Sequence, residues 1–537
     1  MSELRLHDSL TQKLAPLVPR RPGEVRVYCC GPTTYDAAHV GHGRAALAPD
    51  VLVRHLRARG LRVVYARNIT DVDDKILQRA AESGEAPLEL SARMAHLYQE
   101  DMAALGCLPP DVEPKVSEHI PEVVALIERL IERGAAYVAA RPGESPGVSD
   151  VCHDGHDARD VYDVYYAVRS FPDYGKLSKR NLDELRVGAR IGPNEDKRDP
   201  LDFALWKGVA AGGWGWDSPW GKGRPGWHIE CSAMACRYLG PGFDVHCGGM
   251  DLVFPHHENE IAQSEAACPE AAPLASIWIH NGFVNVDKEK MAKSLGNFVR
   301  LSDVYARNDP EALRYFLLTV HYRGPIAFDT HRRDDGRVVF PGVVEAERRV
   351  DYLYATLDRL SALSALPGPP GEGAAPELPA KLPRELAPFV ALADGARERA
   401  AAALDDDLNT PVVLSIVAEV AKAANELADL AQKRRKDQDI ARAAPPLARR
   451  LGAALRASLD VLGLLQTPPE VYQARTQERR LGLLGTTRQA IEAKLAERAE
   501  ARAARDFARG DAIRRELERD GIEVADAPTG TTFRVIV

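Results

Sequence analysis

Two short motifs, far apart in the chain, carry side chains suited to phosphate chemistry: His39-Val-Gly-His42 and Lys290-Met-Ala-Lys-Ser294. The first places two imidazoles and Gly41 just after a short apolar segment. The second places Lys290 and Lys293 on a loop of mostly small residues. Together they suit a reaction that holds a nucleoside triphosphate and neutralises charge as pyrophosphate leaves. Because either motif alone occurs by chance, the prediction depends on finding both in this order.

A second candidate site combines histidine, glutamate and cysteine. Pro255-His-His-Glu-Asn-Glu260 leads into a helical pattern, so His256 and Glu260, four residues apart, share one helix face and can ligate the same ion. Thiolates from Cys30 and Cys231 would complete a set whose three ligand types Zn²⁺ accepts. The alternative is a polar helix start beside two buried cysteines, and the spacing leaves both interpretations open.

Residues 141–163 hold a further concentration of metal-ligand types, Cys152-His-Asp-Gly-His-Asp157. Ligands packed this closely in sequence do not converge on one ion without a turn built for it. We therefore interpret this segment as a solvated loop insertion rather than a metal site.

Composition limits the class of protein. A chain of 537 residues exceeds one ordinary core and predicts about two to four domains. Its net charge of −8 argues against binding nucleic acid through bulk positive charge, but it permits a local basic surface. The start of the chain lacks the apolar core of a signal peptide, and no stretch approaches the about 18–20 apolar residues of a membrane span. We therefore expect a cytoplasmic protein with no membrane contact, whose eight cysteines stay reduced.

The elements around the motifs predict a parallel sheet. Residues 25–29 and 61–66 read as buried strands, and 44–57 between them has helical spacing. Strand, helix and strand at this pitch form a βαβ unit, which indicates an α/β fold with helices on both faces of the sheet. Further strands near 244–246 and 277–280 end in polar residues, and ligands bind at such carboxyl ends.

The second half of the chain changes character. A helical region rich in Ala, Leu, Glu and Arg begins near 310, a Pro/Gly/Ala-rich linker covers 362–384, and helical pattern resumes over 385–465. The last segment, 478–537, combines an Arg/Ala-rich helix, a helix near 511–520 and a terminal strand.

These motifs resemble those of cysteinyl-tRNA synthetases, a family of class I aminoacyl-tRNA synthetases. The similarity spans nearly the whole chain and is carried by residues 28–36, 39–42, 68–75, 226–234, 243–246, 254–260, 290–294, 404–411 and 530–534. It implies a Rossmann-like parallel-sheet catalytic domain with an inserted acceptor-end region, then an α-helical bundle and a small C-terminal α+β anticodon-binding domain. We place these at 1–310 (insertion about 110–200), 311–361 (connecting helices), 362–384 (linker), 385–470 (bundle) and 478–537 (anticodon-binding domain).

The resemblance also assigns roles to residues of the candidate sites. It implies one zinc ion per subunit, held by Cys30, Cys231, His256 and Glu260. The family's first ligand directly precedes the loop glycine, Gly31, which favours Cys30 over Cys29. The family's zinc binds the thiol of the substrate, and a soft metal–thiolate bond distinguishes cysteine from serine where shape cannot.

The remaining substrate contacts follow from the same resemblance. The family's amino-acid pocket falls on Thr70, Trp227, His246 and Asp251, although a core tryptophan and a buried structural histidine are the ordinary alternatives. His39, Gly41, His42, Lys290 and Lys293 would bind ATP, with Mg²⁺ expected on the triphosphate. L-cysteine, ATP and tRNA(Cys) are the implied substrates, region 310–465 would contact the tRNA stem, and we expect a monomer. The anticodon would be read by Arg502, Phe507, Asp511 and Asp526.

Some positions depart from the family pattern. Ala292 stands where serine is usual, and Phe507 and Phe533 replace expected tryptophans. Cys247 replaces a glycine near the expected metal and is interpreted as a packing thiol rather than a stray ligand. Two alternatives of the same ancestry stay open. A cysteine:aminosugar ligase would lack the C-terminal region, and a non-catalytic tRNA-binding paralogue should have lost lysines or ligands.

Overall fold

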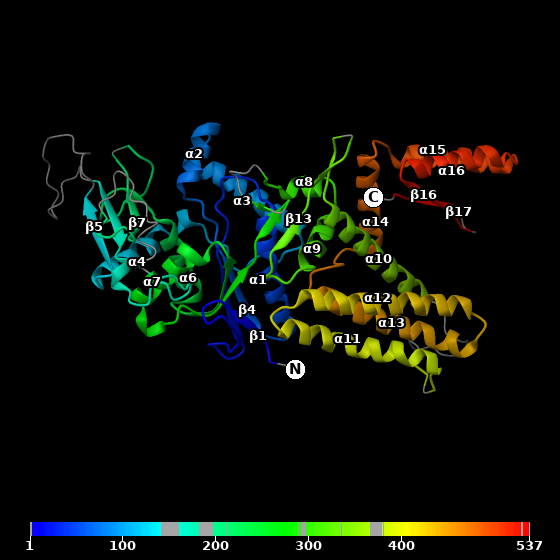
Figure 1. The fold of residues 1–537 in the computed structure, drawn as a ribbon, viewed down its shortest axis with the longest axis horizontal. Coiled ribbons are helices and arrows are strands. Elements are labelled where there is room, and N and C mark those ends of the chain that lie inside the picture. The colour runs from blue at the N-terminus through cyan, green and yellow to red at the C-terminus, as the bar shows by residue number, and fades with distance from the viewer. Residues whose placement is uncertain are drawn as a thin grey trace. The chain divides into compact units, whose positions relative to one another are not determined.

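The computed structural model describes residues 3–140, 161–181, 197–210, 212–287, 289–291, 297–334, 336–365, 378–379, 381–527 and 530–535. The 152–157 ligand cluster and most of the expected linker lie outside these residues, and α10 runs into the first three linker positions. The chain divides into two compact units (Figure 1). Unit 1 comprises Met1–Val284, Val320–Ile326 and Ala401–Thr410, and unit 2 comprises Asn285–Thr319, Ala327–Ala400 and Pro411–Val537.

A four-stranded parallel sheet lies at the centre of unit 1. Its order is β10-β9-β3-β4, and every neighbouring pair is parallel, as the βαβ pattern predicted. The strands are β3 (Glu24–Cys29), β4 (Arg62–Arg67), β9 (Phe243–Gly249) and β10 (Ala275–Asn281). Nearly all residues of β3 and β9 are buried, which is typical of parallel strands covered on both faces.

Helices pack on this sheet and complete its core. Helix α1 (Val40–Ala58) contacts all four strands, and α6 (Trp227–Leu239) contacts β3 and β4. Helix α7 (Glu258–Ala267) packs against α6. The core between the sheet and α6–α7 includes Tyr28, Cys231 and Ile261. The motif loops therefore leave the carboxyl ends of β3, β4 and β9.

An antiparallel sheet is inserted between the parallel strands. Its order is β5-β6-β7-β8, formed by Ala136–Ala140, Tyr162–Tyr166, Phe203–Gly208 and Gly223–Pro225. Helix α4 (Ile120–Glu132) supplies its apolar face to the core beneath this sheet. The other elements of unit 1 are β1 (Arg5–Asp8), β2 (Lys13–Pro16), α2 (Asp74–Ser83) and α3 (Pro87–Ala104).

Unit 2 is mainly helical. Short strands separate α9 from α10, so the helical region near 310 is not continuous. From Val284 to Ser364 the elements are β11 (Val284–Val286), β12 (Glu289–Lys290), α8 (Leu301–Tyr305), α9 (Pro310–Leu318), β13 (Ile326–Phe328), β14 (His331–Arg332), β15 (Val338–Val339) and α10 (Pro341–Ser364). The helices expected over 385–465 are confirmed as α11 (Ala387–Asp405), α12 (Thr410–Lys433) and α13 (Gln438–Asp460).

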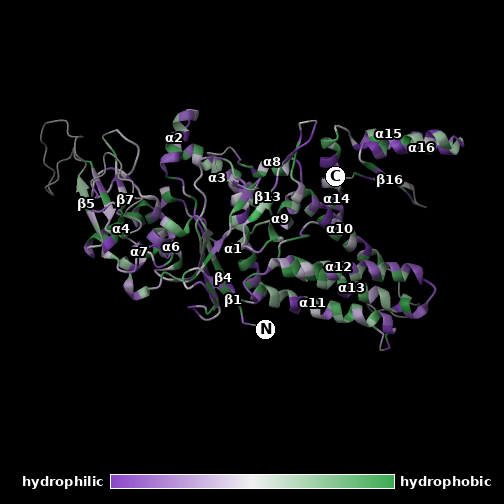
Figure 2. Cartoon of the chain, viewed as in Figure 1, coloured by the Kyte–Doolittle hydropathy of each residue, from purple (hydrophilic) through white to green (hydrophobic). Residues whose placement is uncertain are grey.

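Hydrophobic and hydrophilic residues alternate along α11–α13, as Figure 2 shows, which is the pattern of helices that bury one face. Within the described part of the chain, no helix combines the length and apolarity needed to cross a membrane.

The C-terminal segment forms a small α+β arrangement after α14 (Pro469–Leu483). Helices α15 (Arg488–Ala503) and α16 (Phe507–Arg519) pack on an antiparallel hairpin of β16 (Ile522–Ala527) and β17 (Gly530–Val535). Its core includes Ile491, Leu517 and Val524. The predicted Arg/Ala-rich helix and terminal strand are both present.

Candidate active site

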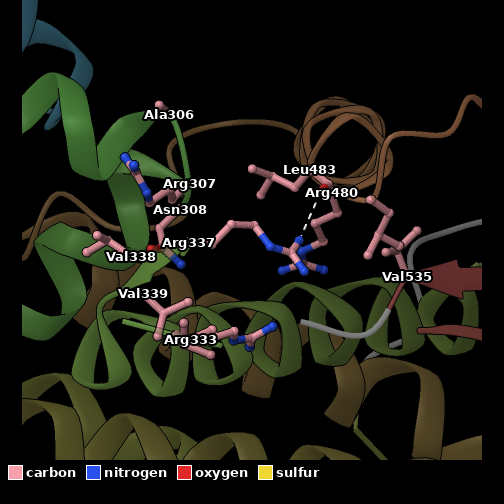
Figure 3. A pocket seen from close by; sticks show the side chains of 12 residues that line it. Ala306, Arg307, Asn308, Arg333, Arg337, Val338, Val339, Arg480, Leu483 and Val535 are labelled. Carbon is pink, nitrogen blue, oxygen red and sulfur yellow. Dashed lines mark hydrogen bonds between the residues drawn. The ribbon is translucent and has the colours of Figure 1, made fainter. Parts of the chain in front are cut away.

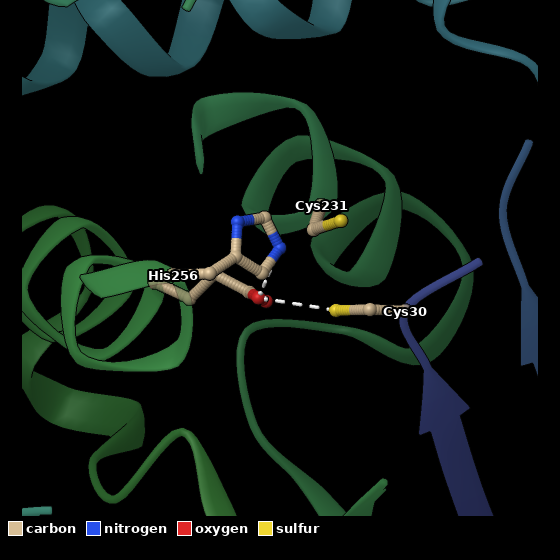
Figure 4. Close-up of side chains that lie close together, drawn as sticks. Cys30, Cys231 and His256 are labelled. Carbon is tan, nitrogen blue, oxygen red and sulfur yellow. Dashed lines mark hydrogen bonds and ion pairs between the residues drawn. The ribbon is translucent and has the colours of Figure 1, made fainter. Parts of the chain in front are cut away.

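The four predicted metal ligands lie together in unit 1, although they come from separate segments (Figure 4). Cys30 follows β3, and Cys231 lies in α6. His256 lies in the helical turn Val253–His257, and Glu260 lies in the first turn of α7. Their ligand atoms all lie within 4.8 Å of one another, and three of the four side chains are buried. The arrangement has the compactness that one metal ion requires.

A close backbone approach positions Cys30. A Cβ atom added to Gly31 would lie 1.5 Å from the Asn68 carbonyl oxygen, so only glycine lets this loop pass the end of β4. The Asn68 side chain then joins the two cysteine-bearing segments. Its Oδ1 accepts from the Gly31 backbone N–H at 2.9 Å and lies 3.6 Å from the Cys231 sulfur.

Glu260 is the electrostatic centre of the cluster. Its Oε1 lies 3.0 Å from His256 Nε2 and accepts from the Cys30 thiol at 3.2 Å, and its Oε2 lies 2.9 Å from His246 Nε2. Burial alone would raise the pKa of Glu260, but His246 and His256 hold that pKa well below its usual range. Glu260 is therefore a carboxylate in spite of complete burial.

The two thiols of the cluster differ in protonation. The hydrogen bond from Cys30 lowers the pKa of Cys231 to about 6, whereas burial raises the pKa of Cys30 well above its ordinary value. Burial opposes protonation of His256, but Glu260 and Cys231 outweigh it and raise the His256 pKa to about 10. The cluster thus holds two buried anions that need compensating positive charge.

This donor set fits a zinc ion. Buried anions are costly unless a cation or proton compensates them, and here a protonated His256 serves when no metal is bound. Two sulfurs, one imidazole and one carboxylate are ligands that borderline-soft Zn²⁺ accepts. A second group, Cys30, His246, His257 and Glu260, satisfies the same distance criterion. The lowered pKa of Cys231 favours the first group, because a thiolate is the ligand form of cysteine.

Three of the four predicted pocket residues lie at or beside the cluster. The Trp227 ring lies 4.4 Å from the His256 ring and is 38% exposed. Thr70 is buried, and its hydroxyl accepts from the Asn68 amide at 3.1 Å. His246 is fully buried, stacked on Trp278 at 4.4 Å. Its Nε2 contacts Glu260, so it can fix the carboxylate of this ligand.

Asp251 differs from these three. It is exposed in the turn after β9, and no described contact ties it to the cluster. Cys247 is buried opposite Cys29 in the β3–β9 register and belongs to neither candidate metal group, which agrees with a packing role.

The histidines of the first motif shape the start of α1. His39 is the N-cap, and the His39 and His42 side chains form reciprocal capping bonds with their ring centroids 3.7 Å apart. The first turn carries no acidic residue. The dipole of such a helix start attracts phosphate.

The lysine motif begins in unit 2. Lys290 is the last residue of β12 and pairs with Asn285 in β11, while Ala292 and Lys293 lie outside the described residues.

Two residues with clear contacts were not predicted as site residues. Asn68 joins the cysteine-bearing segments, and His228 Nδ1 lies 2.9 Å from His256 Nδ1. Burial lowers the pKa of His228 well below its usual value, so a neutral His228 can orient the His256 ring. Both residues lie within the family motifs, near Thr70 and Trp227 in sequence. This closeness was the sequence signal that could have identified them as site residues.

The predicted anticodon residues lie at the C-terminal hairpin and its helices. Arg502 Nη1 lies 2.7 Å from Asp526 Oδ2, and Arg498 binds both oxygens of the same carboxylate at 2.7 and 2.8 Å. Hydrogen bonding to Arg498 holds the pKa of Asp526 well below its usual range. Phe507 begins α16 and is 60% exposed, and Asp511 lies exposed one turn later.

Comparison with known proteins defines the class. The family model for the catalytic domain of class I (C) tRNA synthetases matches residues 16–335, and a DALR domain model matches 400–466. The fold is similar to that of Mycobacterium tuberculosis methionyl-tRNA synthetase in complex with methionyl-adenylate, with a TM-score of 0.58 and 17% identity over 87% of this chain and 94% of that one. A putative arginyl-tRNA synthetase from Campylobacter jejuni gives a TM-score of 0.51 and 12% identity over 83% and 94% of the two chains. The catalytic domain and fold are those of a class I tRNA synthetase.

Similar proteins identify the family within this class. Cysteine--tRNA ligases of Anaeromyxobacter sp. strain K and Anaeromyxobacter dehalogenans strain 2CP-C are 50% and 51% identical to this chain, over 99% of both chains in each case. The cysteine--tRNA ligase of Alkalilimnicola ehrlichii is 45% identical over 99% of each chain. The chain belongs to the cysteine--tRNA ligase family.

Proposed function

We propose that this protein activates L-cysteine with ATP and transfers it to the 3′-terminal adenosine of tRNA(Cys). The observation that carries the proposal is the Cys30, Cys231, His256 and Glu260 cluster, whose soft donors suit recognition of a thiol. Relatives similar over nearly the full chain are cysteine--tRNA ligases, which supports the same reaction.

In the activation step, a carboxylate oxygen of cysteine forms a bond to the α-phosphorus of ATP. The bond to the bridging oxygen of pyrophosphate breaks, and pyrophosphate leaves with the electron pair. His39 and His42, at the positive end of α1, donate hydrogen bonds to phosphate oxygens. Lys290 and Lys293 neutralise the β- and γ-phosphates, and Mg²⁺ accompanies the triphosphate. Catalysis is positioning and charge stabilisation, with no covalent enzyme intermediate.

Selection of cysteine over serine depends on the cluster. Shape alone separates such isosteres by roughly 10–200-fold. Zinc, when bound, supplies a soft Lewis acid that favours a thiolate over a hydroxyl. Around it, Trp227 forms an apolar wall and His246 fixes Glu260. Thr70 lies beside Asn68, and Asp251 is suited to the substrate ammonium group.

Transfer to tRNA involves the rest of the chain. We propose that 1–310, with its insertion at about 110–200, holds the reacting groups and the acceptor end. The helical region 310–465 would contact the tRNA stem, and the segment 478–537 would read the anticodon with Arg502, Phe507, Asp511 and Asp526. An exposed aromatic ring and paired charges at that hairpin suit stacking and base-edge contacts.

One exchange assay tests the proposal. Purified protein, ATP and radiolabelled pyrophosphate should exchange label in the presence of cysteine and not of serine, and tRNA(Cys) should then be charged. Exchange with an aminosugar product but no charging would support the aminosugar ligase instead. Absence of cysteine-dependent pyrophosphate exchange would support a non-catalytic tRNA-binding protein. Elemental analysis should give one zinc per chain.

The role of Lys293 has its own test. Lys293→Ala should slow cysteine-dependent exchange about a hundredfold or more, because it removes charge that stabilises the leaving pyrophosphate. Cysteine binding should stay near the wild-type value, since the cluster is intact. An unchanged exchange rate would contradict the assigned role.

A further inference from the structure

Unit 2 contains a cavity of about 330 Å³ that none of these roles uses (Figure 3). Its walls come from the turn after α8, the β14–β15 hairpin, the start of α10, the last turn of α14 and the end of β17. A volume of this size lies near the lower end of the roughly 300–1,000 Å³ range of small-ligand sites.

The cavity is positively charged. Its lining includes Arg307, Arg333, Arg337 and Arg480, and none of its described lining residues is acidic. Arg480 is 7% exposed and is held by Glu347 and Asp351, each at 2.9 Å. Arg333 and Arg337 lie exposed on the hairpin and are the side chains best placed to meet a ligand.

Two guanidinium groups converge within the cavity. In Figure 3 the side chains of Arg337 and Arg480 reach toward one another from opposite walls. Arg337 Nη1 donates to the Leu483 carbonyl at 3.2 Å, which holds it at the end of α14 from which Arg480 extends. An anion bound between the two guanidinium groups offsets their mutual repulsion and accepts hydrogen bonds from several of their N–H groups at once.

Apart from Asn308, the rest of the lining is apolar. Val338, Val339 and Val344 face Leu483 and Leu484 around the cavity, and both leucines are unusually exposed, at 36% and 38%. A ligand that combines an anion with a flat apolar body matches these walls. A nucleotide has both, since its phosphate suits the arginines and its base suits the aliphatic side chains.

We infer that this cavity binds one nucleotide of the bound tRNA, with its phosphate on Arg333, Arg337 and Arg480 and its base against the α14 leucines. The inference rests on the proposed function. A free nucleotide has the same chemistry, but an adjoining hollow of about 660 Å³ shares Arg480 and Val535 with the cavity and presents Tyr352 and Phe533. A surface that continues beyond one nucleotide favours a polynucleotide.

The test is a salt series of tRNA binding to the double variant Arg333→Gln/Arg337→Gln. Its affinity for tRNA(Cys) should fall about tenfold at low salt. The slope of log K against log salt should flatten by about one per arginine, because each arginine releases about one counterion. The control is Arg332→Gln, which removes one arginine charge from the same hairpin outside the cavity lining. It should bind within twofold of wild type.

Two further measurements separate the possible failures. Cysteine-dependent exchange needs no tRNA, so it should be equal in wild type, control and double variant. Its absence in wild type would refute the proposed function. Equal exchange with unchanged tRNA affinity and salt slope would refute the cavity assignment alone. Equilibrium dialysis with AMP completes the set. AMP binding lost in the double variant, with tRNA binding unchanged, would assign the cavity to a free nucleotide and also refute the inference.

Discussion

The candidate metal cluster of unit 1 and the C-terminal charge set of unit 2 (Arg498, Arg502 and Asp526) each centre on one carboxylate, in opposite surroundings. In the cluster, four separate segments place their donor atoms within 4.8 Å of one another, and nearly all are buried. In the C-terminal set, Arg502 and Asp526 bind one another at an exposed hairpin, and Phe507 is open to solvent.

The two regions differ in how far protein contacts alone fix their charged side chains. Burial removes competing water, so Glu260 and Cys231 must hold their charges with protein partners or a cation. Exposed ion pairs contribute only about 0–1 kcal/mol and are easily exchanged for contacts with a base or phosphate. The protein alone therefore assembles the cluster, while the charges of the exposed hairpin can exchange partners.

Removing one donor from the cluster should have the largest effect. Cys30→Ala should lower zinc content well below one per chain and reduce cysteine-dependent exchange by at least about a hundredfold, because loss of even an outer partner of a metal ligand costs about 10–100-fold. Zinc content and exchange are measured on the same preparation.

Cys29→Ala is the matched control. Cys29 is buried beside Cys247 and belongs to neither candidate metal group. It should keep its zinc and most of its exchange activity, with a modest loss of stability from the small cavity. Equal zinc loss in both variants would mean that the preformed cluster is not the metal site.

This pair also shows where sequence reasoning stops. The spacing of His256 and Glu260 predicts a shared ligand position, and their contact of 3.0 Å confirms that these side chains meet. Nothing in Cys29-Cys30 alone decides which thiol turns toward them, and only the family resemblance favoured Cys30. The role of Asn68 could not be predicted, since it depends on the register of β3 with β4 and on how closely Gly31 passes its carbonyl.

The arginines that share Asp526 differ in burial and allow an intermediate test. The Arg498 side chain is 4% exposed, whereas that of Arg502 is 48% exposed. Arg498→Gln should lower the free energy of unfolding by about 1–3 kcal/mol, because it removes a buried guanidinium group that binds both oxygens of Asp526. Arg502→Gln should leave stability within about 0.5 kcal/mol of wild type and should instead raise the KM for tRNA severalfold.

Urea denaturation and charging kinetics measure these two effects. The opposite result would be a loss of stability in Arg502→Gln alone, with no change in its KM for tRNA. That result would show that the exposed arginine is structural, and the contrast between the buried cluster and the exposed hairpin would not hold.

The C-terminal segment was predicted well at the level of elements and less well at the level of side chains. Its helices and terminal strand follow from helical spacing and β-branched residues, which are local signals. The shared Asp526 pairing follows from the hairpin register, in which Asp526 lies opposite Thr531, and from the distance between α15 and β16. Such contacts depend on tertiary packing, so sequence supplied the residues without their partners.

A buried histidine–aspartate pair in unit 1 gives the smallest expected effect and isolates burial from metal binding. His55 Nε2 lies 2.8 Å from Asp405 Oδ1, and Arg59 also binds this carboxylate. Burial lowers the pKa of His55 below its ordinary value. As pH falls below about 6.5, the unfolded chain takes up a proton at this position that the folded protein does not, so stability falls until the folded pKa is reached. Above that window the pair contributes no pH dependence.

The free energy of unfolding, measured by urea denaturation, should fall between pH 7.5 and pH 5.5 in the wild type. In His55→Gln this fall should be smaller by up to about 1 kcal/mol. His96→Gln is the control, because the His96 side chain is 70% exposed, and its pH profile should match that of wild type. Identical profiles for all three proteins would mean that burial alone does not set protonation at position 55. The charge states of the candidate metal cluster would then depend on a bound ion rather than on burial.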